Sequence, residues 1–235
     1  MRRTFDDTLR WSEAGTKLFL DAAVGWGEEQ YLASSGLPGW SRKHLVAHVA
    51  ANADALSNLV HWAATGEKTP MYSSSQQRNA DIEVGARKPA AELAGWLRES
   101  TERLAAGIAG LNAEQWRTEV VTAQGRTVPA TEIPWMRSRE VCVHAVDLAA
   151  GVAFADLPVG FLAALADDVV GKRSSATGPA VVLTTTDTDD RWALPGEDAA
   201  TVIGPLAEVA AYLAGRPHTL TATDGSPTPV LPTWL

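Results

Sequence analysis

Apolar side chains recur every three or four residues through most of residues 5–151 of this 235-residue chain. This spacing is typical of amphipathic helices, which bury one stripe of their surface. Glycine, proline and serine residues separate the periodic segments and mark where helices begin and end. The pattern predicts long helices over residues 5–34, 41–65, 89–110 and 131–151, a shorter one near 79–86, and a hairpin at 119–128.

The pattern changes after Phe154, where short β-branched runs alternate with helical segments. We expect an α+β protein with a four-helix bundle in residues 1–154 and a small α/β domain in residues 155–235. In the second part the sequence predicts helices at 159–170 and 206–214, and strands at 180–186, 191–194 and 201–203.

Composition argues against several classes of protein. With 46% apolar and 20% charged residues, the chain resembles a globular protein rather than a disordered or fibrous one. The formal charge is -8 and no block is rich in Lys or Arg, so we expect no nucleic-acid partner. No stretch of about 18 apolar residues predicts a membrane span. A single cysteine and the lack of a signal-peptide pattern favour a cytoplasmic protein.

Glu140 and His144 are four residues apart on a predicted helix, so their side chains project from the same face. Such pairs are also common as ion pairs on helix surfaces. Here the neighbouring residues are apolar, which indicates a largely buried helix where an unpaired carboxylate is costly. A bound cation would offset that cost, and an ion pair with Arg137 or Arg139 is the alternative.

A third metal ligand is expected from the helix at 41–65. We choose His48 because apolar residues surround it, whereas His44 lies in the exposed first turn and His61 faces the other side of the helix. Three ligands of the His₂Glu type leave one position of a tetrahedral zinc ion open, which is the catalytic arrangement. The same ligands suit iron or nickel, so zinc is a preference.

Three further residues have simpler readings. Asp147 either orients His144 or pairs with an arginine. Cys142 is two residues from each ligand on the helix and is expected to be an inert core thiol that points away from the metal. His218 follows a proline in a turn and is expected to be solvated, with a substrate contact as the alternative.

At these residues the chain resembles the mycothiol-dependent maleylpyruvate isomerases. The similarity extends to segments that carry no metal ligand. The matching segments are WSRKHLVAHVA (40–50), HWAATGEKTPMY (61–72), TAQGRTVPA (122–130), WMRSREVCVHAVDL (135–148) and AYLAGR (211–216).

The resemblance implies a DinB-like four-helix bundle followed by an α/β domain, with zinc on His48, Glu140 and His144. It also implies a functional arginine at Arg216, which would otherwise be read as a cation that neutralises carbonyls at a helix end. Two departures are Cys142, in place of a bulky apolar residue, and a Pro217-His218 continuation in place of a glycine-rich one. Tyr72, Arg78 and Arg139 are further candidates for binding substrate or thiol.

The implied reaction is the cis–trans isomerisation of maleylpyruvate to fumarylpyruvate in the gentisate pathway, through reversible addition of a thiolate to the double bond. The expected partners are a small dicarboxylate substrate and mycothiol, a low-molecular-weight thiol. One alternative is a mycothiol S-transferase or another thiol-adding metalloenzyme. Another is a non-enzymatic bundle that stores metal or senses a ligand.

Overall fold

The computed structural model describes residues 3–23, 25–173 and 178–232. The chain divides into two compact units, one formed by Phe5–Val152 and the other by Ala153–Leu235 together with Met1–Thr4. The first unit is almost entirely helical, and the second combines helices with a small sheet. The predicted fold class, a helical bundle followed by a small α/β part, is confirmed.

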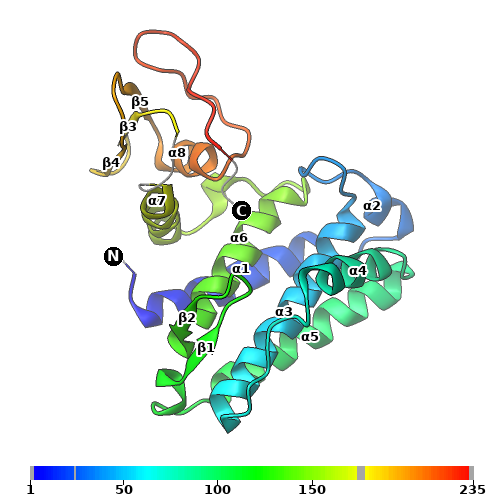
Figure 1. Ribbon diagram of the computed structural model, residues 1–235. Coiled ribbons are helices and arrows are strands. Elements are labelled where there is room, and N and C mark those ends of the chain that lie inside the picture. The colour runs from blue at the N-terminus through cyan, green and yellow to red at the C-terminus, as the bar shows by residue number, and fades with distance from the viewer. Residues whose placement is uncertain (1–2, 24, 174–177, 233–235) are drawn as a thin grey trace. The chain divides into compact units, whose positions relative to one another are not determined.

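The helical unit is built around four long helices. Helix α1 packs along α6, while α3 packs against α4, α5 and α6 (Figure 1). A short antiparallel hairpin precedes α6. The elements are α1 (Phe5–Ala23), α2 (Glu28–Leu32), α3 (Arg42–Thr65), α4 (Ser75–Ala86), α5 (Ala90–Gly110), β1 (Glu119–Val121), β2 (Thr127–Pro129) and α6 (Ile133–Asp147).

Local sequence signals account for several helix ends. Ser41 precedes α3 in extended conformation, and Gly66 ends that helix with φ 79°, a conformation that favours glycine. The prediction of one helix over residues 5–34 is wrong, because α1 ends at Ala23 and Gly25 has φ 73°. Helix α4 begins earlier than predicted, because the Ser74 hydroxyl accepts a hydrogen bond from the Gln77 amide.

Helix α6 ends at Asp147 rather than near residue 151. Ala149 has φ 51°, which takes the chain out of the helix. The side chain of Arg42 donates hydrogen bonds to the carbonyls of Leu148 (2.8 Å) and Ala149 (2.6 Å). This end of α6 is therefore held by the first residue of α3, close in space to the candidate ligands.

The second unit contains a three-stranded sheet of order β4-β3-β5, in which β3 pairs antiparallel with β4 and parallel with β5. Helices α7 and α8 pack on one face of this sheet (Figure 1). The elements are α7 (Val159–Arg173), β3 (Val181–Thr185), β4 (Arg191–Leu194), β5 (Ala200–Gly204) and α8 (Leu206–Leu213).

Among the described residues, no helix has the length and apolar character that crossing a membrane requires. The residues that follow α8 form a proline-containing stretch without further helix, described to Pro232. The final residues of the predicted tail, 233–235, lie outside the described part of the chain.

Candidate metal centre

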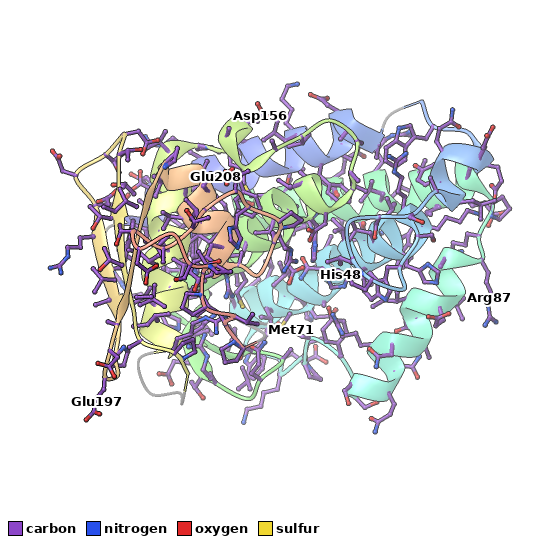
Figure 2. All side chains as sticks on the ribbon, turned by 90° about the horizontal axis from the view of Figure 1, so that it is seen from above. His48, Met71, Arg87, Asp156, Glu197 and Glu208 are labelled. Atoms are coloured by element: carbon purple, nitrogen blue, oxygen red, sulfur yellow. The ribbon has the colours of Figure 1, made fainter. Side chains whose placement is uncertain are left out.

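Three side chains that could bind metal converge in the helical unit. His48 lies on α3, and Glu140 and His144 lie on α6. The Nε2 atom of His48 is 3.0 Å from Oε2 of Glu140, and Nε2 of His144 is 3.3 Å from the same oxygen. One ligand atom of each residue lies within 4.8 Å of the other two. Figure 2 shows His48 among the side chains of the helical unit.

The two helices position these groups through their packing. Apolar residues of α3 on both sides of His48 are fully buried, as are Val141 and Ala145 on α6. Glu140 and His144 are one turn apart on α6, so both face α3 and His48. His48 itself is 5% exposed, which makes the site a largely buried cluster of polar groups.

Asp147 orients His144. Its carboxylate is buried, and Oδ2 lies 2.8 Å from Nδ1 of His144. An acceptor at Nδ1 keeps the proton on that nitrogen and leaves Nε2 free to bind a cation. Of the two readings that the sequence left open for Asp147, the geometry fits the orientation of His144.

The charges of the cluster are coupled. Burial raises the pKa of Glu140, but the charges of His48 and His144 and their hydrogen bonds outweigh burial and hold the pKa well below its ordinary value. Burial lowers the pKa of His48, and Glu140 only partly offsets this effect. For His144, hydrogen bonds to Asp147 and Glu140 overcome the effect of burial and raise the pKa to about 9.

Two of the donor separations suit a common metal ion. A divalent ion about 2.1 Å from each of two donors, at tetrahedral to octahedral angles, places those donors roughly 3.0–3.4 Å apart. The separations of 3.0 and 3.3 Å from Glu140 to the two imidazoles lie in this range. Two imidazoles and one carboxylate are also a donor set that first-row divalent ions accept.

Arg78 and Trp40 lie beside His48, and Tyr72 lies next to Arg78. Nη2 of Arg78 lies 3.4 Å from Nδ1 of His48, and its guanidinium carbon lies 5.9 Å from the centre of the Tyr72 ring. Burial and the charge of Glu140 raise the pKa of Tyr72 to about 12, so the phenol stays protonated. The Trp40 ring lies 5.6 Å from the His48 ring. Sequence reasoning named the first two as candidates and missed Trp40, whose only signal was its position just before α3.

The remaining histidines lie elsewhere. Nδ1 of His44 accepts a hydrogen bond from the Ser41 amide at the start of α3, which accounts for its position in the first turn. His61 is exposed and lies 3.4 Å from Glu67. His218 belongs to the C-terminal unit and was expected to be solvated, but it is half-buried with its ring 5.0 Å from that of Tyr212.

The other residues of α6 have structural contacts. Cys142 is fully buried and its thiol points to the Trp11 carbonyl, 3.7 Å away, and burial raises its pKa to about 12. The expectation of a core thiol is confirmed. Arg137 donates to the Val49 carbonyl and to Asn52, and Arg139 lies over the Trp135 ring.

Arg216 follows α8 in the C-terminal unit. Its amide donates to the Ala211 carbonyl, and Nη1 donates to the Ala214 carbonyl at 2.8 Å. These contacts are those of a cation at a helix end. They leave the role that the resemblance implies for Arg216 as a prediction.

Comparisons with known proteins agree on one family. The sequence model of the mycothiol maleylpyruvate isomerase N-terminal domain matches residues 13–149. The crystal structures of a mycothiol-dependent maleylpyruvate isomerase and of its histidine-to-alanine variant are each 40% identical to this chain. Each match covers 99% of this chain and 98% of the other, with a TM-score of 0.93. The search of curated proteins found no significant match. The chain belongs to the mycothiol-dependent maleylpyruvate isomerase family.

Proposed function

We propose that this chain catalyses the mycothiol-dependent conversion of maleylpyruvate to fumarylpyruvate, a step of the gentisate pathway, with a divalent ion held by His48, Glu140 and His144. The observation that carries the proposal is the convergence of these three donors from two helices, in a chain of this enzyme family. Zinc is the ion that we favour, because the His₂Glu set is typical of catalytic zinc.

The reaction requires temporary loss of a double bond. Rotation about a conjugated C=C bond is slow until a nucleophile adds and converts it to a single bond, and a thiolate is a good reversible nucleophile. A divalent ion held by His48, Glu140 and His144 would supply a Lewis acid that lowers the pKa of the thiol. Three protein ligands, rather than four, are compatible with that role.

The residues of the chain provide the remaining parts. Asp147 holds His144 in the tautomer that presents Nε2. Arg78 lies beside His48, where its guanidinium could pair with a substrate carboxylate. Arg216 is our candidate for stabilising the developing enolate, as the family resemblance implies.

A direct assay tests the proposal. Purified, zinc-loaded protein with mycothiol should convert maleylpyruvate, followed by its absorbance change, and omission of either mycothiol or metal should abolish turnover. Titration of thiol after many turnovers should show no net loss, because the isomerase regenerates its thiol each cycle. No turnover, or consumption of thiol in proportion to product, would reject the isomerase; the second result would indicate a transferase.

Variants separate metal binding from chemistry. We expect His48→Ala, Glu140→Ala and His144→Ala each to lose bound metal and activity together. Arg216→Ala should keep its metal while its turnover falls, since the arginine is proposed to act on substrate. Metal content and rate measured on the same samples test this division, and an Arg216→Ala variant of full activity would remove the arginine from the mechanism.

A further inference from the structure

The helical unit contains a cavity whose lining includes none of the three candidate metal ligands. It has a volume of about 360 Å³ and is bounded mainly by α1 and α5. Its walls are largely apolar, with Leu9 on α1 and Leu104, Ile108 and Trp116 on the other side. This volume is in the range of small-molecule sites, which combine apolar walls with a few polar groups.

The cavity contains a buried cation. Arg137 lines it while being only 2% exposed. Burial lowers the pKa of Arg137 to about 10, so the side chain remains charged near neutral pH. A buried charge needs partners, because its removal from water costs several kcal/mol. Among the described residues, no carboxylate lies within ion-pair distance of this guanidinium.

Counting donors shows which N–H groups of the guanidinium lack an acceptor. Of its five N–H groups, three are directed at the Val49 carbonyl, the Asn52 side chain and the Thr101 hydroxyl. The Nε atom has no acceptor within residues 3–23, 25–173 and 178–232. The N–H of Nε and one N–H of Nη2 therefore lack a protein acceptor, and a carboxylate is a strong acceptor for guanidinium N–H groups.

Two hydroxyl groups line the same cavity as this cation. Thr101, which accepts from Arg137, also lines the cavity. Ser12 lines it from α1, is 8% exposed, and its hydroxyl makes no hydrogen bond with any other described residue. Both can donate to an anion. The carboxylate of Glu13 is exposed on the lining, and its charge disfavours ligands that carry a second negative group.

The geometry points to a binding site for a small monocarboxylate with an apolar chain, its carboxylate on Arg137 and its chain along Leu104, Ile108 and Trp116. The apolar walls recognise the chain and the buried guanidinium recognises the charge. Neither feature takes part in the isomerase that we propose, so this inference stands independently of it.

Calorimetric titration of the full-length, metal-loaded protein tests this site with hexanoate as the probe. Two controls separate the contributions of chain and charge: 1-hexanol has the chain without the charge, and acetate has the charge without the chain. We expect hexanoate to bind at least about tenfold more tightly than either control, and to bind equally well after treatment with a chelator. Equal affinity for hexanoate and hexanol, loss of binding on chelation, or no binding at about 10 mM would each overturn the proposal.

Matched variants on α5 locate the site without touching Arg137. Ala105 lines the cavity and is exposed to solvent, whereas the next residue, Ala106, is exposed but not part of the lining. Ala105→Phe should fill the cavity and weaken hexanoate binding about tenfold or more, and Ala106→Phe should leave it unchanged. Arg137→Met, if it folds, should reduce the affinity for hexanoate to that for hexanol. An Ala105→Phe variant with unchanged affinity would place the ligand elsewhere and refute the site.

Discussion

The Asp147 carboxylate determines which nitrogen His144 can offer to a cation. It is 3% exposed and lies three residues beyond His144 on the same helix. A buried carboxylate at 2.8 Å from Nδ1 accepts the proton of that nitrogen and increases the basicity of the ring. The same contact helps to raise the pKa of His144. A proton and a metal ion therefore compete for the ring of His144.

We predict that Asp147→Asn lowers metal affinity about 10- to 100-fold, because the amide is a weaker acceptor and does not fix the tautomer of His144. Competition with a chelator of known affinity measures the change. Asp21→Asn is a suitable control, since Asp21 is exposed on α1 and pairs with Lys17. Equal affinities for the Asp147→Asn variant and the parent protein would show that the carboxylate does not support the ligand.

Metal binding near neutral pH should release about one proton per ion from His144, because its pKa is raised to about 9 and a ligand must be deprotonated. Calorimetry at pH 7.5 in buffers of different ionisation enthalpy counts the protons. In the metal-free protein the raised pKa also stabilises the fold below about pH 6.5. That stability is lost as the pH rises through about 9.

The pH itself provides the control for proton release. Well above pH 9, His144 is already neutral in the metal-free protein, so the release should vanish. Absence of proton release at pH 7.5 would contradict the charge that we assign to His144.

Between elements, α1 and α6 pack closely at Gly15. A Cβ atom on Gly15 of α1 would lie 2.4 Å from Sγ of Cys142 and 2.8 Å from Cγ2 of Val141. Both of these side chains are fully buried, so they have little room to move. Gly15 therefore allows the close approach of the helix that carries two candidate ligands.

We predict that Gly15→Ala lowers the free energy of unfolding by about 1–3 kcal/mol, because overpacking outweighs the better helix propensity of alanine. Urea unfolding measures the change. Gly95→Ala on α5 is the matched control: nothing lies within 4 Å of its added Cβ, so the variant should gain about 0.5–1 kcal/mol. The double variant Gly15→Ala with Cys142→Ala should recover part of the loss, and the absence of any recovery would argue against contact with Cys142.

Sequence predicted the elements whose signals are local. The start of α3 after Ser41 and the beginning of α5 after Pro89 follow from capping residues. The end of α6 could not be predicted, because it depends on hydrogen bonds from Arg42, more than a hundred residues earlier. The start of α4 was predicted near residue 79, but Ser74 caps the helix and Ser75 is its first residue.

The candidate site was predictable to a similar extent. Spacing alone placed Glu140 and His144 on one face of a helix. His48 had to be chosen by its apolar surroundings, and the structure brings it to 3.0 Å from Glu140. The positions of Arg78 and Trp40 depend on how the segments outside α3 and α6 fold around His48, which periodicity does not report.

For the whole molecule, the candidate ligands belong to one of the two compact units. His48 and Glu140 are 92 residues apart in sequence and meet only when α3 packs on α6. An ion that requires all three donors therefore binds the folded helical unit and not the unfolded chain. Its binding energy adds to the stability of residues Phe5–Val152, whereas the unit that contains the sheet supplies none of the three ligands.

Metal removal should therefore destabilise one unit selectively. At a free-ion concentration about 100 times the dissociation constant, binding adds about 2.7 kcal/mol to the folded state. A chelator should then accelerate hydrogen exchange about 100-fold for those amides of α3 and α6 that exchange by global opening of the unit, and leave β3 unchanged. Mass spectrometry of peptides from residues 42–65, 133–147 and 181–185 measures both. In the His48→Ala variant the chelator should have no effect on exchange. Equal acceleration of exchange in β3 would mean that the two units unfold together. No acceleration of exchange in α3 would mean that the ion binds elsewhere.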